Sequence, residues 1–134
     1  MIKTLYFLFF VCIFSLGLWA CKGKQPDKFK NLSVDKFETL IEDPNVQLMD
    51  VRTVAEYSNG HIPGSLNINV QSDTIAADVD SLLDKSRPVA VYCRIGRRSR
   101  NAAKLLVEKG FQKVYNLDKG FLAWKELDKA METI

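Results

Sequence analysis

Residues 88–100 read Pro88-Val89-Ala90-Val91-Tyr92-Cys93-Arg94-Ile95-Gly96-Arg97-Arg98-Ser99-Arg100. The apolar part predicts a short buried strand, and the polar part after Gly96 predicts a helix. A strand that enters a helix through a glycine-containing turn presents backbone N–H groups and a positive helix end to an anion. Four arginines lie in the seven residues after Cys93, and nearby cations favour the thiolate, the reactive form of cysteine. The segment therefore predicts a cysteine nucleophile in a pocket that binds negative charge.

On both sides of this segment, short apolar runs alternate with apolar positions at helical spacing. Ser33 and Thr53 are placed to cap two helices, Asn59-Gly60 is placed to end the second, and Gly110 is placed to close the helix after Cys93. The predicted strands are 29–32, 46–51, 66–68, 88–92 and 113–117, and the predicted helices are 33–41, 53–57, 73–83, 99–109 and 121–131.

This alternation predicts a single α/β domain with a central parallel sheet of about five strands and helices on both faces. In open sheets of this kind, ligands bind outside the carboxyl ends of the strands. Asp50 and Cys93 both stand at such predicted ends. We therefore expect the two residues to lie at the same edge of the sheet, where the site should be.

The amino-terminal residues carry a different signal. Lys3 precedes a nearly unbroken apolar run from Leu5 to Ala20, which predicts a secretory signal peptide over residues 1–20. Leu18-Trp19-Ala20-Cys21 resembles the signal box of bacterial lipoproteins, so Cys21 is the predicted lipidation site; an uncleaved anchor helix is the alternative. Residues 21–30 are then the anchor cysteine and tether, and residues 31–134 the domain. Both alternatives place the domain in the bacterial cell envelope, held at a membrane and facing the periplasm or the exterior.

The charge distribution gives no indication of nucleic-acid binding. The whole chain has a formal net charge of +3, but residues 31–134 hold 14 Lys/Arg and 15 Asp/Glu, a net charge of −1. The basic excess lies in the signal and tether, where lysines suit either anionic lipid headgroups or solvent.

The cysteine count leaves one free thiol in the mature chain. Cys12 lies in the predicted signal and Cys21 would carry the lipid, so Cys93 has no partner for a disulfide. A small buried hydrophobe is one interpretation of such a cysteine. The arginines and the glycine turn favour the other interpretation, a reactive thiolate.

The surroundings of Cys93 suit transfer of a sulfur atom. The single histidine, His61, stands in a Pro-Gly loop and is interpreted as a loop-structuring residue rather than a base. A thiolate stabilised by amides and arginines needs no base to attack the outer sulfur of a donor such as thiosulfate or a persulfide. A thiol or cyanide-like acceptor then removes the sulfur from the cysteine persulfide. Arg94 and Arg98 are expected to act in the site and Arg100 to face solvent, and the chemistry requires no cofactor and no metal.

Three groups of residues resemble the rhodanese domain family. Asp50-Val51-Arg52, Glu56-Tyr57, Gly60-His61-Ile62-Pro63-Gly64-Ser65 and Asn67-Ile68 resemble its first signature. The segment from Tyr92 to Ser99 resembles its active-site loop, and Gly120-Phe121 with Trp124 resembles its C-terminal stretch. The resemblance runs in the family's order from about Leu32 to about Leu127. It implies a compact α/β domain and a sulfurtransferase activity.

The resemblance also implies roles for single residues. Cys93 is then the persulfide-forming nucleophile, and the loop that cradles it is formed by Arg94, Ile95, Gly96, Arg97 and Arg98. The supporting residues are Asp50, Arg52 and Ser99, with Asp50 expected to pair with an arginine and fix the loop. Glu56 and Tyr57 are expected to anchor their turn. Ile95 stands where the family often has a small residue, which disfavours a small hydrated anion as the donor.

Two other functions compete with sulfur transfer. A phosphatase or arsenate reductase loop needs an arginine where this chain has Ser99, so the spacing disfavours phosphate. A non-catalytic, membrane-tethered module that binds a partner or senses thiol oxidants is the main alternative, although Cys93 together with its arginines favours an enzyme. The expected partners are a small anionic sulfur donor, a thiol or cyanide-like acceptor and, through the lipid, a membrane. We expect the domain to be a monomer.

Overall fold

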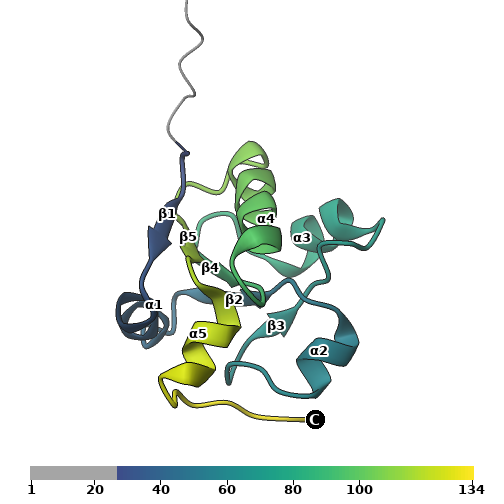
Figure 1. Cartoon of the computed structure of the whole chain (residues 1–134). Helices are drawn as coiled ribbons and strands as arrows, with labels where there is room; N and C mark the ends of the chain where they lie inside the picture. The colour runs from purple at the N-terminus through teal and green to yellow at the C-terminus, as the bar shows by residue number, and fades with distance from the viewer. Residues whose placement is uncertain (1–26) are drawn as a thin grey trace, which may run out of the picture.

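The computed structural model describes residues 27–134. Its centre is one sheet of five parallel strands in the order β1-β5-β4-β2-β3 (Figure 1). The strands are β1 Lys30–Leu32, β2 Gln47–Asp50, β3 Leu66–Asn67, β4 Val89–Tyr92 and β5 Val114–Leu117. The predicted α/β fold with a parallel sheet is thus confirmed, and the strand that ends just before Cys93 is the middle one.

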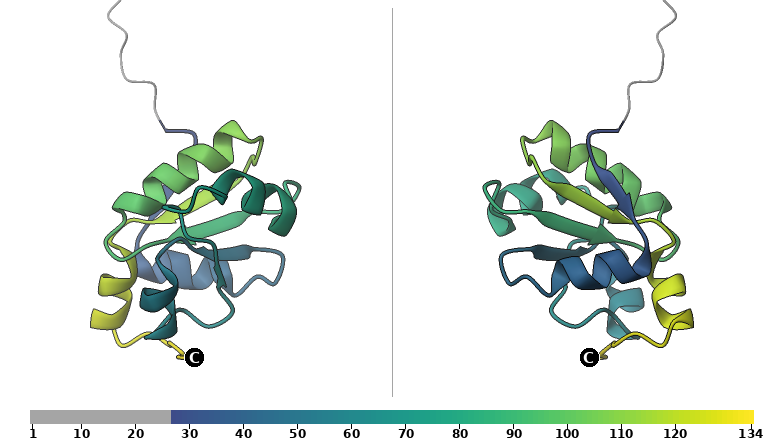
Figure 2. Two further views of the ribbon diagram at one scale, coloured as in Figure 1. Left: turned by 90° about the vertical axis from the view of Figure 1, so that its right-hand side faces the viewer. Right: turned by 90° about the vertical axis from the view of Figure 1, so that its left-hand side faces the viewer.

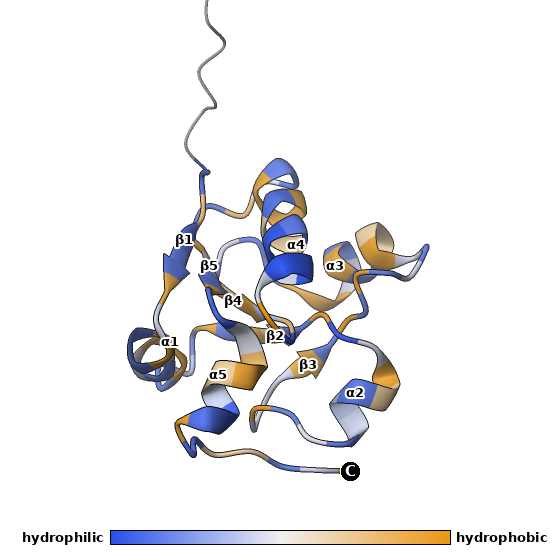
Figure 3. Cartoon of the chain, in the orientation of Figure 1, coloured by the Kyte–Doolittle hydropathy of each residue, from blue (hydrophilic) through white to orange (hydrophobic). Residues whose placement is uncertain are grey.

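In the described residues, four helices connect the strands and a fifth follows β5, so that both faces of the sheet are covered. The helices are α1 Val34–Ile41, α2 Val54–Ser58, α3 Ile75–Leu82, α4 Arg97–Glu108 and α5 Gly120–Glu126. Figure 2 shows α3 and α4 on one side of the sheet and α1 on the other. The first turn of α4 is strongly hydrophilic (Figure 3), whereas its residues Ala102, Ala103 and Leu106 are buried against the sheet.

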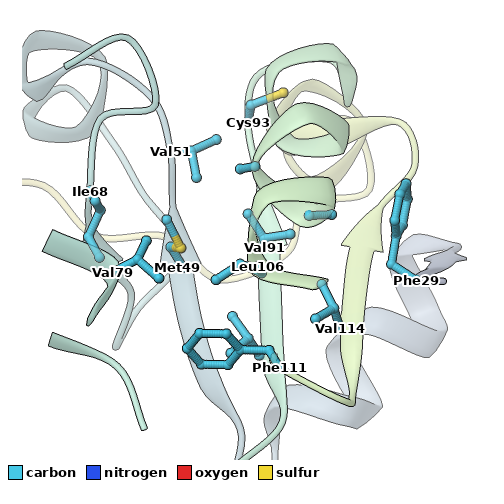
Figure 4. Packing of buried hydrophobic residues seen from close by; sticks show 13 residues of the cluster. Phe29, Met49, Val51, Ile68, Val79, Val91, Cys93, Leu106, Phe111 and Val114 are labelled. Carbon is cyan, nitrogen blue, oxygen red and sulfur yellow. The ribbon is translucent and has the colours of Figure 1, made fainter. Parts of the chain in front are cut away.

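Alternation along β4 divides the core into two clusters. Val89, Val91 and Cys93 belong to the cluster under α3 and α4, and Ala90 and Tyr92 belong to the cluster on the side of α1 and α5. Figure 4 shows Cys93 at the end of the first cluster, next to Val51. The pleat of β4 therefore directs the thiol toward the face that α4 covers.

The local signals in the sequence form the expected caps. The Ser33 side chain accepts a hydrogen bond from the Lys36 N–H at 3.4 Å at the start of α1. At the start of α2, the Thr53 hydroxyl accepts from the Glu56 N–H at 3.3 Å, and the Glu56 carboxylate accepts from the Thr53 N–H at 3.0 Å. This reciprocal pair is a capping box, and it fixes where Glu56 points.

Several helix ends differ from the prediction by one or two residues, and α5 ends five residues early. Helix α4 begins at Arg97 instead of Ser99, because Gly96 is its N-cap residue. Helix α5 ends at Glu126 instead of Met131, because Asp128 adopts a left-handed conformation with φ 53° and the Lys129 N–H returns to the Trp124 carbonyl. Helical spacing from Ile75 and Val79 would favour burial of Leu82 in α3, but its side chain is 54% exposed.

The residues after α5 run back along the molecule toward α2. The backbones of His61 and Glu132 exchange two hydrogen bonds of 2.9 Å, and the Ile134 N–H donates to the Ser58 carbonyl at 3.2 Å. The Trp124 indole N–H holds the intervening chain by donating to the Ala130 carbonyl at 2.8 Å. We call residues 128–134 the C-terminal strap.

Within residues 27–134, no helix combines the length and the hydropathy that a membrane span requires. The predicted signal peptide of residues 1–20 and the predicted lipidation site Cys21 lie outside the part of the chain that the structure describes.

Candidate active site

The Cys93 sulfur lies inside the turn that joins β4 to α4. The Gly96 N–H donates a hydrogen bond to Sγ at 3.1 Å, and the Ser99 hydroxyl donates to it at 3.3 Å. Gly96 is the N-cap residue of α4, and Ser99 lies in its first turn. The backbone N–H groups at this end of a helix have no partner within the helix, so they are available to the sulfur. The sequence placed Cys93, Gly96 and Ser99 in this region, and the structure brings the three together.

These donors stabilise the charged form of the sulfur. Burial raises the pKa of the Cys93 thiol, but hydrogen bonds from the Ser99 hydroxyl and from the backbone N–H groups of Ser99, Ile95 and Gly96 outweigh burial, so the pKa lies below its ordinary value. From the sequence, this task was expected of the backbone amides of the turn together with the arginines. In the structure, the hydrogen bonds of the loop provide most of the stabilisation.

Helix α5 holds the loop in the conformation that points its amides at the sulfur. The Phe121 N–H donates to the Cys93 carbonyl at 2.8 Å, and the Leu122 N–H donates to the Arg94 carbonyl at 3.0 Å. Since the first carbonyls of the loop face α5, the amides that follow them are free to face Sγ. The start of α5 is thus part of the site, although the sequence gave it only a family resemblance.

Two glycines allow the loop and the start of α5 to lie this close. Gly96 has φ 94°, and a Cβ atom there would collide with the Asp118 carbonyl. Gly120 has φ 66°, and a Cβ atom there would collide with the Arg94 carbonyl. Both positions combine a left-handed backbone with a backbone contact, so a side chain at either one must displace the loop.

The four arginines after Cys93 have different environments. Arg98 makes a bidentate ion pair with Glu56, with two N–O distances of 2.8 Å. Arg100 pairs with Asp118 at 2.6 Å on an exposed part of the surface. Arg94 and Arg97 are exposed and make no ion pair within the described range 27–134. Arg100, expected to be solvated, is exposed but paired.

The Glu56–Arg98 pair ties α2 to the active-site turn. Its first effect is on Glu56: the hydrogen bond from Arg98, against the opposing effect of burial, lowers the pKa of this carboxyl to about 2. The same hydrogen bond with Glu56 raises the pKa of Arg98, and the negative charge of Cys93 adds a smaller contribution to that rise. Sequence reasoning gave Glu56 a local anchoring role and missed this contact, because the two residues are separated by 42 positions.

Asp50 pairs with an arginine, but with a different one from the loop arginines. Its carboxylate accepts two hydrogen bonds from Arg52 Nε at 3.0 Å and one from Arg52 Nη2 at 2.7 Å. Arg52 also donates to the Gly60 carbonyl at 2.7 Å and stacks over the Phe121 ring at 4.3 Å. The expectation that Asp50 fixes the Cys93 loop directly is corrected: the pair fixes residues 52–60.

The loop that contains His61 is held in place by ring stacking and hydrogen bonds. His61 is 2% exposed and stacks on the Tyr57 ring, and its Nδ1 donates to the Tyr57 carbonyl at 2.8 Å. Its Nε2 lies 3.1 Å from the Glu132 carboxylate in the C-terminal strap. The Tyr92 hydroxyl accepts from the Ile62 N–H at 3.0 Å. Both ring nitrogens of His61 are therefore engaged away from Cys93, in agreement with a loop-structuring role.

The sulfur itself has no solvent-exposed surface, whereas Ile95 in the same loop is 53% exposed. A donor molecule can therefore reach Cys93 only when the atoms that cover the sulfur move. Among the residues from 27 to 134, no group of three or more His, Cys, Asp or Glu side chains is placed to hold a metal ion.

Comparison with known proteins identifies the class. The model of the rhodanese-like domain family matches residues 33–127. The thiosulfate sulfurtransferase GlpE of Shewanella oneidensis is 42% identical over 98 residues, which cover 73% of this chain and 94% of that protein. GlpE of Pseudoalteromonas translucida is 35% identical over 100 residues, 72% of this chain and 90% of that protein. The chain belongs to the rhodanese-like domain family.

Solved structures agree with this assignment. The rhodanese-like domain of the Anabaena protein Alr3790 is similar with a TM-score of 0.70 and 28% identity, and the match covers 78% of this chain and 79% of that one. A rhodanese-like domain protein of Staphylococcus aureus is similar with a TM-score of 0.67 and 30% identity, over 79% and 99% of the two chains. The fold expected from the resemblance is thus confirmed.

Proposed function

We propose that this chain is a sulfurtransferase that carries a sulfane sulfur from thiosulfate or a persulfide to a thiophilic acceptor through a persulfide on Cys93. The observation that carries the proposal is the loop around Sγ, in which Gly96 and Ser99 donate to the sulfur and the pKa of the thiol is lowered. The names of the GlpE relatives support the same reaction class.

The first half-reaction forms the persulfide. The Cys93 thiolate attacks the outer sulfur of thiosulfate, the Sγ–S bond forms, the sulfur–sulfur bond of the donor breaks, and sulfite leaves with the electron pair. No proton has to move, so no base is needed. The N–H donors that stabilise the thiolate are then in reach of the new persulfide anion.

The second half-reaction returns the enzyme to its starting state. The acceptor, a thiolate or cyanide, attacks the outer sulfur of the persulfide. The bond between that sulfur and Sγ breaks, and the Cys93 thiolate leaves. The acceptor becomes a persulfide or thiocyanate, and Cys93 regains its hydrogen bonds.

The exposed side chain of Ile95 bears on whether thiosulfate or an organic persulfide is the better donor. Ile95 places an exposed apolar side chain in the loop, which contributes nothing to binding a small hydrated dianion but packs against an organic chain. We therefore propose that persulfides are used at least as well as thiosulfate. A ratio of kcat/KM values that strongly favours thiosulfate would contradict this preference.

Mass spectrometry tests the proposed function. After treatment with thiosulfate or an organic persulfide, Cys93 should gain one sulfur atom, and cyanide or a thiol should remove it. The absence of solvent exposure at Cys93 is the observation that favours the alternative, a non-catalytic binding or redox-sensing module. That alternative predicts no sulfur gain with any donor.

We also propose that the chain is a lipoprotein of the bacterial cell envelope, with Cys21 as the lipidated residue and residues 31–134 as the domain. The support is the order of Lys3, the apolar run and Cys21 in the sequence. Expressed in bacteria as the full chain, the protein should fractionate with membranes, and Cys21→Ser should release it. Retention of the Cys21→Ser protein in the membrane fraction would favour an uncleaved anchor helix instead.

A further inference from the structure

A cavity of about 270 Å³ lies beside the active-site loop, and its function is not accounted for by the chemistry above. Arg94, the residue after Cys93, forms part of its wall. The wall also includes Arg52, Glu56, Phe121, Leu122, Lys125 and Met131. The volume lies at the lower end of the range for ligand pockets, which suits a small organic molecule.

The charges around the cavity leave an excess of positive charge. Arg52, which also lines it, is neutralised by Asp50 at 2.7 Å, and Glu56 is neutralised by Arg98. Arg94 and Lys125 line the cavity and make no ion pair within residues 27–134. Two uncompensated cations in one small cavity favour an anionic ligand, and a carboxylate is the group that both bind well.

The rest of the wall is apolar. Phe121 is buried beneath the cavity, Leu122 is 38% exposed and Met131 is 48% exposed. Thiosulfate has no apolar part to place against such a wall, whereas a chain of methylene groups gains free energy there. The cavity therefore fits a carboxylate on an organic chain better than it fits the inorganic donor.

Met131 reaches the cavity through the C-terminal strap, which follows the family-matched residues 33–127. The strap is attached at three places: Trp124 binds Ala130, His61 binds Glu132, and Ser58 binds Ile134. A segment outside the family match thus supplies one wall of a cavity that also contacts the active-site loop.

We propose that this cavity binds the sulfur acceptor, and that the acceptor is a small organic thiol that carries a carboxylate. The inference rests on the proposed function. The carboxylate pairs with Arg94 and Lys125, and the methylene groups pack against Leu122 and Met131. When the active-site loop moves and exposes the persulfide to the cavity, the acceptor thiolate attacks its outer sulfur. The persulfide bond breaks, Cys93 leaves as the thiolate, and the product is the acceptor persulfide.

Discharge kinetics test this assignment. Protein with the Cys93 persulfide preformed is mixed with 3-mercaptopropionate or with its neutral analogue 3-mercaptopropionamide. The carboxylate thiol should react with a kcat/KM about tenfold higher, and Lys125→Gln should remove most of that difference by raising KM. Lys36→Gln, a matched loss of an exposed lysine on α1, should keep it. Equal reactivity of the two thiols in the wild-type protein would overturn the proposal.

A second pair of variants tests the strap. With a longer thiol, 6-mercaptohexanoate, Met131→Ala should lower kcat/KM about fivefold, because the chain loses its apolar wall. Ile134→Ala removes an 86% exposed side chain of the same segment that does not line the cavity, and should leave kcat/KM unchanged within about twofold. Equal effects of the two variants would contradict a role for Met131 in acceptor specificity.

A binding measurement separates this inference from the proposed function. Cys93→Ser protein is titrated with 3-mercaptopropionate and followed by the amide resonances of Leu122, Lys125 and Met131. Shifts at these residues that Lys125→Gln abolishes support the site even if no persulfide ever forms. Normal sulfur transfer to 3-mercaptopropionate without such shifts would overturn the site and keep the sulfurtransferase. Transfer only to a protein thiol would assign the surface to a macromolecular acceptor and also overturn the proposal.

Discussion

Two turns leave neighbouring parallel strands at the same edge of the sheet and use arginine in opposite ways. After β2, Arg52 is 4% exposed and is neutralised by Asp50. After β4, the arginines point outward or toward α2, and the polar groups that face the sulfur are backbone amides and the Ser99 hydroxyl. The first turn is an ion pair that holds structure, and the second is a set of hydrogen-bond donors around a buried sulfur, where they stabilise its negative charge.

The comparison shows where the electrostatic stabilisation of the thiolate comes from. Amides are fixed by the backbone, so they stabilise the charge without having to be ordered at the moment of reaction. Arginine side chains at the same place carry more charge but also need their own partners, as Arg98 does with Glu56. The sequence divided the stabilisation between amides and arginines, and in the structure the amides and the Ser99 hydroxyl are the groups that donate to the sulfur.

In the turn after β4, removal of the Cys93 sulfur should have the largest effect of all on activity. Cys93→Ser should lower sulfur transfer by at least about a thousandfold, because the nucleophile is lost. The serine hydroxyl fits the buried position and keeps hydrogen-bonding partners in Gly96 and Ser99, so the thermal unfolding midpoint should stay within a few degrees. Turnover by this variant equal to that of the wild type would end the persulfide mechanism.

In the turn after β2, loss of the Asp50–Arg52 ion pair should mainly lower the free energy of unfolding. Asp50→Ala leaves the buried Arg52 guanidinium without its counter-ion, which should cost about 3–5 kcal/mol of the free energy of unfolding, measured with urea. Asp80→Ala, which removes an exposed carboxylate paired with Lys109, should change the free energy of unfolding far less, because solvent screens the pair. Similar losses in the two variants would mean that the Asp50–Arg52 pair is not the structural centre of its turn.

The loop geometry can be tested with two glycines of similar backbone conformation. Gly96→Ala should lower kcat/KM on the order of a hundredfold, because the new Cβ meets the Asp118 carbonyl and displaces the N–H that binds Sγ. Gly110→Ala, with φ 98° and nothing near its Cβ, should cost about 1 kcal/mol of stability and little activity. Comparable activities of the two alanine variants would show that the position of the Gly96 amide does not matter.

The arginines should have the smallest effects. Arg98→Ala breaks the pair with Glu56 and loosens α2 against the loop, and should lower kcat/KM for the donor by about tenfold with a stability loss near 1 kcal/mol. Arg100→Ala removes an exposed pair with Asp118, and kcat/KM should change by less than about twofold. Steady-state kinetics on both variants make the comparison, and equal losses would contradict the distinction drawn between them.

The sequence predicted what depends on local chemistry. The alternation of elements, the Thr53 cap of α2, and Gly110 after α4 were predictable because each depends on residues close together in the chain. The position of Cys93 at the carboxyl end of β4 followed from the parallel sheet. The start of α4 was misplaced by two residues, since a left-handed Gly96 at its N-cap is decided by the close approach of Asp118.

Contacts between distant residues were out of reach of the sequence. Glu56 with Arg98, Gly120 against Arg94 and His61 with Glu132 join elements whose relative position only the folded sheet determines. The helix predicted through Met131 was wrong for the same reason. The apolar spacing after Trp124 suited a helix, but the strap instead hydrogen-bonds to His61 and Ser58, which are distant in the sequence.

The central claim is that loop amides and Ser99 hold Cys93 as a thiolate. The direct measurement is a spectroscopic pH titration of the thiolate, taken as the difference between the wild-type chain and Cys93→Ser so that Cys12 and Cys21 cancel. The account predicts a pKa below the ordinary value of about 8.5, and a higher pKa in Ser99→Ala, which loses the hydroxyl donor to Sγ. A pKa at or above the ordinary value, unchanged in Ser99→Ala, would contradict it.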